Sequence, residues 1–394
     1  MRASPSARAD AISRHRFPAS RALSMPLVRD RAFVTARRDA LRRILLWCPP
    51  ILRHKLHTMP RQIQVPVAKD RFVILHYHIF KNAGSTIDYA LARNFGEGFV
   101  EFHGVHDDAA LSADDVHPLV SSDLSIQAVT SHHLRYPKPV MRGIHFIDVC
   151  FIRHPLDRIR SLYHYGRKQD PASWLGGLAH QYDEAGFVAH LADHAPHAIN
   201  DVQVNFLVNG GFYARPPGAA DRDEACAIVE RVCALGVVDL FDVSMVAIER
   251  YLRPMFPSLS MEYVRQNVSA PEPHVVESGS EAITTACRQA WGDALYAKVF
   301  ALNEQDLRLY AKAREEVMRR FSLVPDRHAR LDEFRERCAR LAEAEALQFK
   351  ARQPEAQQSE GKPAAMIPDE VAGSDAAGSP QVAGAVDGAA ADPS

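Results

Sequence analysis

The sequence has no apolar run long enough to cross a bilayer. The best candidate span, residues 44–52, is short and is interrupted by Pro49 and Pro50, whereas a membrane helix needs about 20 apolar residues. The same segment follows too many arginines to resemble a secretory signal. We therefore expect a cytoplasmic protein.

Paired cysteines are also missing. The six cysteines are scattered, with no Cys-x-x-Cys pair and no histidine at zinc-ligand spacing. This distribution suits free thiols in a reducing compartment better than a disulfide framework or a structural metal site. We expect no bound metal.

Neither sign of charge is in excess. The 47 Lys and Arg nearly balance the 48 Asp and Glu, and 47% of the residues are hydrophobic. These proportions are typical of a globular domain with a substantial core. A chain with so little net charge is not expected to bind nucleic acid.

The positive charge that is present gathers in the N-terminal segment. Residues 1–68 contain many arginines and only three acidic residues, and we interpret them as a basic flexible leader. The amphipathic stretch 33–46 leaves open a second interpretation, a helix that lies on an anionic membrane surface or binds a partner.

The C-terminal end is also distinct in composition. Residues 351–394 have few large apolar side chains and are predicted to be disordered, since they cannot offset their ordering entropy. Residues 326–350 have helical periodicity with alternating charge, which predicts an appended, exposed helix. The remaining residues, 69–325, fit one α/β domain.

Two segments of this domain repeat the order strand, tight turn, helix. Residues 72–79 and 145–152 are apolar and β-rich, and residues 86–95 and 156–165 have helical spacing. This order predicts a three-layer αβα fold of the P-loop type, with a central parallel sheet. Ligands bind beyond the carboxyl ends of such strands, so both turns are candidate sites.

The first turn, residues 80–86, reads FKNAGST. Gly84 can take backbone conformations closed to other residues, and the first amides of the following helix have no acceptor within it. With Lys81 and the hydroxyls of Ser85 and Thr86, these amides favour an anion. A simple N-cap would not explain a lysine and a glycine on the same turn.

The second turn lies within residues 150–165, which read CFIRHPLDRIRSLYHY. Arg153 ends the strand, and Ser161 lies about one turn into the next helix. A guanidinium fork and a hydroxyl placed in this way can converge on one phosphate. A local ion pair between Arg153 and Asp157 is the alternative.

Together the two turns resemble the donor-binding motifs of sulfotransferases that use 3′-phosphoadenosine-5′-phosphosulfate (PAPS), especially the carbohydrate branch that includes heparan sulfate 2-O-sulfotransferase. The first family motif often reads H-x-P-K-T-G-G-T-S; residues 78–86 have Phe80 for Pro, Asn82 for Thr and Ala83 for Gly, and the two hydroxyl residues are exchanged at Ser85 and Thr86. The second reads R-D-P-x-x-R-x-x-S-x-Y, with His154 in place of the Asp. The likeness covers residues from about 70 to 320.

The resemblance implies a sulfotransferase domain that moves a sulfuryl group from PAPS to an acceptor hydroxyl, with a glycan as the expected acceptor. By the same resemblance Lys81 stabilises the leaving oxygen, Arg153 and Ser161 bind the 3′-phosphate, and Arg158 packs locally. The phosphosulfate would contact one loop, formed by Lys81, Asn82, Ala83, Gly84, Ser85 and Thr86.

A base is also expected, to take the proton of the acceptor hydroxyl, and histidine suits that task. In the 2-O-sulfotransferase branch a histidine just before the second strand has this role, and His133 matches it. His132, His78 and Glu101 remain alternatives. Asn205 stands where many relatives have Arg, so no acceptor contact is assigned to it.

Two other functions compete with this one. The first is a P-loop-type kinase that acts on a small molecule with ATP, but Lys81 precedes the glycine, whereas a Walker A lysine follows its last glycine directly. The second is a catalytically silent nucleotide-binding or scaffold protein.

Overall fold

The computed structural model describes residues 14–15, 70–104, 109–211, 213–266 and 280–359. The chain divides into two units, Met1–Ala344 and Glu345–Ser394. Except for residues 14–15, the predicted leader lies outside the described residues, and so does the predicted tail beyond Ser359.

A six-stranded sheet forms the centre of the first unit, in the order β1-β3-β4-β2-β5-β6. The five strands from β3 to β6 run parallel, and β1 pairs antiparallel with β3. The predicted parallel sheet is therefore confirmed. The strand bounds are β1 Arg14–His15, β2 Arg71–Tyr77, β3 Phe99–Phe102, β4 Ala128–Ser131, β5 Ile144–Ile152 and β6 Ala234–Val237.

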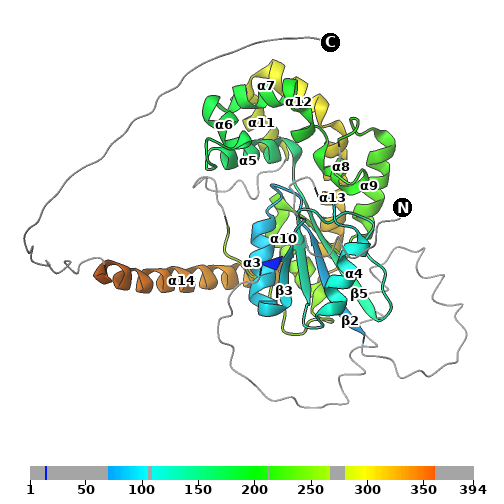
Figure 1. Ribbon diagram of the computed structural model, residues 1–394, viewed down its shortest axis with the longest axis vertical. Helices are drawn as coiled ribbons and strands as arrows, with labels where there is room; N and C mark the ends of the chain where they lie inside the picture. The colour runs from blue at the N-terminus through cyan, green and yellow to red at the C-terminus, as the bar shows by residue number, and fades with distance from the viewer. Residues whose placement is uncertain (1–13, 16–69, 105–108, 212, 267–279, 360–394) are drawn as a thin grey trace, which may run out of the picture. The chain divides into compact units, whose positions relative to one another are not determined.

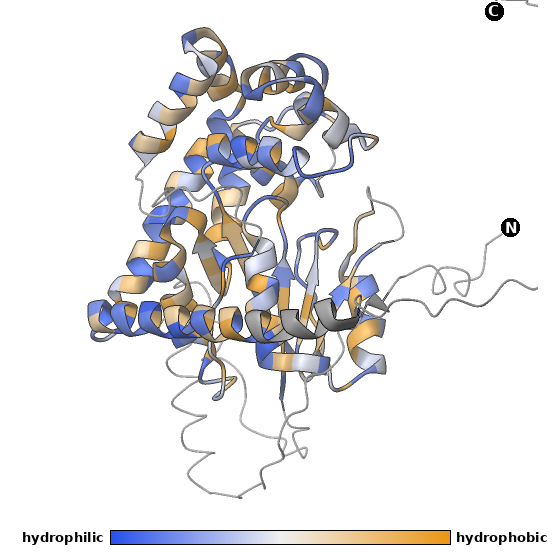
Figure 2. Cartoon of the chain, turned by 90° about the vertical axis from the view of Figure 1, so that its left-hand side faces the viewer, coloured by the Kyte–Doolittle hydropathy of each residue, from blue (hydrophilic) through white to orange (hydrophobic). Residues whose placement is uncertain are grey.

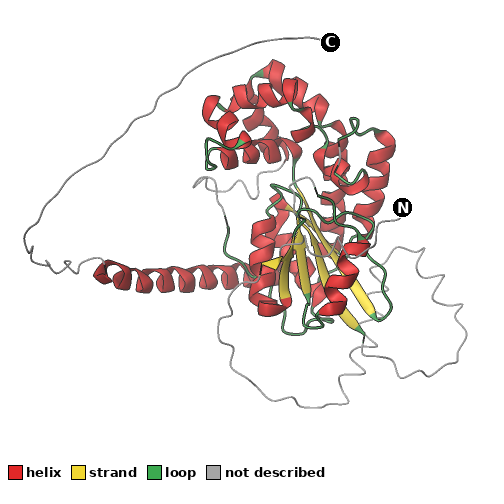
Figure 3. Ribbon diagram, viewed as in Figure 1, coloured by secondary structure: helices red, strands yellow, loops and turns green. Residues whose placement is uncertain are grey.

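Helices cover both faces of this sheet, as Figure 3 shows. One face packs against α4 (Ala113–Ser122), α8 (Val202–Val208), α9 (Ala219–Arg231) and α13 (Glu304–Ser322). The other face packs against α3 (Gly84–Phe95), α10 (Phe241–Leu252) and the first turns of α14 (Arg327–Ser359). Hydrophobic and hydrophilic residues alternate along the covering helices (Figure 2), as expected of elements with one buried side.

Strand β2 lies between β4 and β5 and contributes to both layers. Val73, Leu75 and Tyr77 belong to one apolar cluster and Ile74 to the other, because successive side chains of a strand point to opposite faces. His76 and His78 therefore share the face that α3 covers.

Five further helices form a separate apolar cluster where β5 leads into α5 (Figure 1). They are α5 (Pro155–Gly166), α6 (Trp174–Gln181), α7 (Glu184–His194), α11 (Ser280–Trp291) and α12 (Asp293–Leu302). Short 3-10 helices lie at Gly96–Gly98, Pro196–Ala198 and Val238–Leu240. The two strand-turn-helix segments predicted from the sequence are β2–α3 and β5–α5.

Helix α14 differs from the appended, exposed helix that the sequence predicted. Leu331 and Phe334 are buried in the apolar cluster shared with α10, so the first turns belong to the core. The helix also continues through residues 351–359, which were predicted to be disordered. Most of these residues are good helix formers, which the compositional argument neglected.

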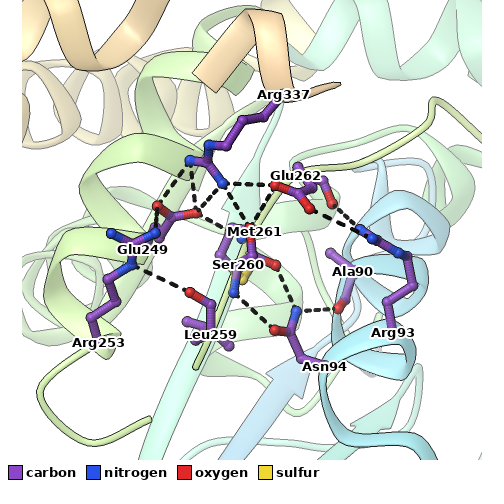
Figure 4. Close-up of polar contacts among 10 residues, drawn as sticks. All are labelled: Ala90, Arg93, Asn94, Glu249, Arg253, Leu259, Ser260, Met261, Glu262 and Arg337. Carbon is purple, nitrogen blue, oxygen red and sulfur yellow. Dashed lines mark hydrogen bonds and ion pairs between the residues drawn. The ribbon is translucent and has the colours of Figure 1, made fainter. Parts of the chain in front are cut away.

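A polar network fixes the first turns of α14 to the domain (Figure 4). Arg337 donates to Glu249 of α10 at 2.9 Å and to Glu262 at 2.8 Å. Glu249 is nearly buried, with 9% of its side chain exposed. Asn94 of α3 is bonded to both backbone groups of Ser260, so the network reaches three helices.

Two expectations from composition concern single features. The five cysteines among the described residues, Cys150, Cys226, Cys233, Cys287 and Cys338, are free thiols. Within the same part of the chain, no helix combines the length and apolar character that a membrane span requires.

Replacing Arg337 with Ala is expected to lower the free energy of unfolding by about 2 kcal/mol, since the nearly buried Glu249 carboxylate loses its bonds from Arg337 and keeps only Arg253 and the Met261 amide as partners. Urea unfolding followed by circular dichroism measures the change. The control is Arg340→Ala on the same helix. Arg340 pairs with Glu336 at 3.6 Å on the exposed surface, so its loss should leave stability nearly unchanged. Equal effects of the two substitutions would contradict the anchoring role of Arg337.

Candidate functional site

The two predicted turns lie side by side. Strands β2 and β5 pair in parallel up to Tyr77 and Cys150, so their carboxyl ends share one edge of the sheet. Arg153 Nη1 donates a 2.8 Å hydrogen bond to the backbone carbonyl of Lys81. The structure thus brings together the two motif residues that are 72 positions apart in the chain.

A buried amide links these turns. Gln203 of α8 accepts hydrogen bonds from the side chain of Asn82 at 2.8 Å and from the backbone N–H of Arg153 at 2.9 Å. Its own NH₂ group donates to the Arg153 carbonyl at 2.9 Å and to Asp306. Asp306 also accepts the backbone N–H groups of Gln203 and Val204. The side chain of Asn82 therefore points into the interior and supports the turn, and it does not face a ligand.

The backbone of the first turn is strained at two residues. Lys81 has a φ of 68° and Ala83 a φ of 60°, in the left-handed region that costs a non-glycine residue about 1–2 kcal/mol. At position 83 the resembled family has glycine, which takes a left-handed φ at little cost. Such strain is retained where surrounding contacts impose it, often at functional sites.

Gly84 is needed for a different reason from the one its sequence position suggested. Gly84 is not one of the described glycines that have a left-handed φ. A Cβ on Gly84 would lie 1.9 Å from Nε2 of His78, so the missing side chain leaves room for the imidazole. The expected conformational freedom is not used here.

The amides of this loop divide into two groups. Those of Asn82 and Thr86 donate to the carbonyls of Ile79 and Ala83, both at 3.1 Å. Among the described residues the amides of Ala83, Gly84 and Ser85 have no backbone acceptor, and the Ser85 side chain is exposed. These three amides, those of Gly84 and Ser85 at the start of α3 among them, are the donors left for the expected anion.

Lys81 provides a positive charge beside these donors. Its ammonium lies 4.1 Å from the centre of the Tyr165 ring, a cation–π contact that holds it in place. Burial, and then the positive charges of Arg153, Lys168 and Arg158, lower the pKa of Lys81 to about 8. Positively charged side chains that repel one another in this way are stabilised by a bound anion.

Two hydrogen bonds hold the guanidinium group of Arg153. Its Nε donates to Asp157 at 2.6 Å, so the local ion pair considered from the sequence is present, and its Nη1 contacts Lys81. Nη2 has no partner among the described residues. Ser161, half-buried on α5, likewise makes no side-chain hydrogen bond to them, so both groups can accommodate an oxyanion.

Five histidines gather at the carboxyl ends of β2, β3 and β4. The rings of His76 and His78 are stacked at 5.1 Å, and the rings of His78 and His132 are 3.8 Å apart. His103 lies 5.9 Å from His132 and 5.7 Å from His133 between ring centres. Glu101, the carboxylate candidate, lies 3.9 Å from His103.

Hydrogen bonds assign different tautomers to the two neighbouring histidines of the loop after β4. His132 Nδ1 lies 3.0 Å from the carbonyl of His78 and so carries a proton, which leaves Nε2 as a proton acceptor. His133 Nδ1 instead accepts the amide hydrogen of Gly104 at 2.8 Å. The proton of neutral His133 then lies on Nε2, and the ring has no nitrogen ready to take another.

Burial keeps His132 neutral. Desolvation, and then the neighbouring His78, lower the pKa of His132 to about 3. Burial likewise lowers the pKa of His78, against the opposing effect of Asp88. Despite its own burial, the Asp88 carboxyl has a pKa well below its usual range, because His76 and His78 surround it.

Three other residues that the resemblance brought into question are buried. Arg158 donates to the carbonyl of Ala198 at 2.8 Å, so it is structural, as expected. His154 packs edge-on against Tyr310 with ring centres 5.0 Å apart, and burial lowers its pKa to about 4. Asn205 is buried in α8 and accepts from Asn209.

Sequence reasoning assigned no role to Gln203, His76 or Asp88. Two signals were present. The alternation of His76 and His78 along a strand places both on one face. Asp88 follows Gly84 by one helical turn, which directs it toward that face.

No family model matches this sequence. An uncharacterized protein from Archaeoglobus fulgidus is 28% identical to it over 247 residues, which cover 62% of this chain and 96% of the archaeal protein. The name of that protein states no activity.

Proposed function

We propose that this protein transfers a sulfuryl group from PAPS to the hydroxyl of an acceptor, with a glycan as the expected acceptor class. The observation that carries the proposal is the hydrogen bond from Arg153 to the Lys81 carbonyl. It places two cationic turns side by side at the carboxyl edge of a parallel sheet, where ligands of such folds bind.

Each turn would hold one end of the donor. Lys81, with the amides of Gly84 and Ser85, faces the 5′-phosphosulfate, and the helix dipole of α3 adds to the attraction. Arg153 and Ser161 hold the 3′-phosphate. Nη2 of Arg153 is the donor available for it, while Asp157 and the Lys81 carbonyl keep the guanidinium in position.

Positioning and charge stabilisation would supply most of the rate enhancement, as in phosphoryl transfer. The acceptor oxygen attacks sulfur, the bond from sulfur to the bridging phosphate oxygen breaks, and Lys81 stabilises the negative charge that develops on that oxygen. The acceptor proton goes to Nε2 of His132. We propose His132 in place of His133 because its tautomer leaves Nε2 unprotonated.

The low pKa of His132 belongs to the protein without donor. A bound anionic donor next to the ring favours the imidazolium and raises this pKa toward the range in which a general base is effective. His132 is also in contact with Phe80, at 5.9 Å between ring centres, and Phe80 borders Lys81. The proposed base His132 and Lys81 thus both contact the ring of Phe80.

Binding of adenosine 3′,5′-bisphosphate tests the donor site. We expect calorimetric titration to detect binding without Mg²⁺, and Arg153→Ala to weaken it about 10-fold or more, because a charge-assisted contact to phosphate is lost. Arg160→Ala is the control, since Arg160 lies on the same helix but pairs with Glu184. Binding of ATP with Mg²⁺ and none of the bisphosphate would favour the kinase.

The pKa of Lys81 predicts a pH dependence of that binding. The anion prefers protonated Lys81, so affinity should be constant below about pH 8 and fall about tenfold per pH unit above it. Lys81→Arg should keep its charge and remove the fall. Titrations between pH 7 and 9.5 measure the slope, and a flat profile in the parent protein would refute the role of Lys81.

Transfer of radiolabel from PAPS to acceptors in an extract of the source cells tests the base. We expect His132→Ala to lower the transfer rate about 100-fold or more with bisphosphate affinity kept, the range typical of general base catalysis. His133→Ala should have a smaller effect, because the ring that accepts from Gly104 has no unprotonated nitrogen left for the acceptor proton. The reverse order of the two variants would restore His133 as the base.

A further inference from the structure

One cluster beside the candidate site has no role in the proposed transfer. His76 of β2 and His78, one residue beyond the end of that strand, point toward α3, where Asp88 faces them. One nitrogen of each histidine and one carboxylate oxygen all lie within 4.8 Å of one another. Three potential metal ligands from two elements therefore converge on one point.

The contacts within this cluster are short and enclosed. His76 Nδ1 lies 2.8 Å from one carboxylate oxygen of Asp88, and His78 Nδ1 lies 2.9 Å from the other. The exposed fractions of the three side chains are 1%, 9% and 14%. The hydroxyl of Thr130 adds a fourth polar group, 2.9 Å from His76 Nδ1.

Two imidazoles and one carboxylate are a ligand set that first-row transition metals accept, whereas Mg²⁺ and Ca²⁺ prefer oxygen ligands alone. We propose that His76, His78 and Asp88 bind one divalent transition-metal ion, with Zn²⁺ as the probe. The fourth position faces Thr130 or is taken by water, as at zinc sites with three protein ligands.

Binding of the ion would leave the charge of both histidines unchanged and would require small movements of the three side chains. When the lone pair of Nδ1 binds the ion, the proton that Nδ1 carried moves through solvent to Nε2, so both histidines stay neutral. Ligands around a tetrahedral zinc lie about 3.3 Å apart, given bonds of about 2.0 Å. His76 and His78 now contact different oxygens of Asp88, at 2.8 Å and 2.9 Å, so the carboxylate has to turn to bring one oxygen within about 3.3 Å of both nitrogens.

The expected effect of the ion is structural. It would tie the carboxyl end of β2 to the second turn of α3, and the strained turn that contains Lys81 and Ala83 lies between these two points. Metal binding to the folded chain then stabilises it by mass action. This inference does not depend on the proposed sulfuryl transfer, because its test requires neither donor nor acceptor.

The competing explanation is that the same three side chains only exchange hydrogen bonds. Asp88 would then accept one proton from each imidazole, and the carboxylate would be satisfied without an ion. The two explanations differ in affinity for metal, which the full-length protein can report directly.

The experiment treats the full-length protein with EDTA, removes the chelator, and titrates ZnCl₂ while heat and melting temperature are recorded. We expect one Zn²⁺ per chain with a raised melting temperature, and no effect of MgCl₂ at the same concentration. Zinc that neither binds at one equivalent nor raises the melting temperature would overturn the proposal in favour of the hydrogen-bonded cluster.

A matched pair of variants locates the ion. Asp88→Asn should weaken zinc binding at least tenfold. His145→Gln should leave it unchanged, because His145 pairs with Asp70 at 3.6 Å on the surface. If Asp88→Asn does not fold, visible absorption of the parent protein with Co²⁺ gives a readout without a variant. Bands of four- or five-coordinate Co²⁺ support the site, and the weak spectrum of the hydrated ion rejects it.

Discussion

The side-chain amide of Gln203 connects the parts of the site. It accepts from Asn82 and from the Arg153 backbone, and it donates to the Arg153 carbonyl and to Asp306. Gln203, Asn82 and Asp306 are buried, and each buried partner left unpaired would cost about 1–3 kcal/mol. The relative position of the two turns is therefore set by directional hydrogen bonds, and apolar packing of the sheet alone would leave it less well defined.

The two turns place positive charges close together at the edge of the sheet. Lys81 is partly buried beside Arg153, and its lowered pKa reflects the cost of that arrangement. Asp157 compensates part of the charge. The remainder is available to a multiply charged anion, which is the property that the proposed donor requires. Backbone strain at Lys81 and Ala83 is consistent with a turn shaped for contact with a ligand.

The histidines next to this edge are organised by their hydrogen bonds. Asp88 contacts Nδ1 of His76 and of His78, the His78 carbonyl accepts from His132, and Gly104 donates to His133. Neighbouring imidazoles consequently present different atoms to the site, although the residue type is the same. Burial keeps the ring of His132 neutral, which suits both proton acceptance and a location near cations.

The sequence by itself determined the parallel sheet, the positions of β2, α3, β5 and α5, and the placement of both turns at one edge, because apolar periodicity is a local property and the strands of a parallel sheet all end at the same edge. It did not determine that Asn82 supports the loop, since its partner Gln203 is 121 residues away. Nor could it show that Gly84 makes room for His78, or which nitrogen of His132 and His133 carries the proton. Those features depend on contacts between side chains and backbone groups from different elements, and only the tertiary structure brings these together.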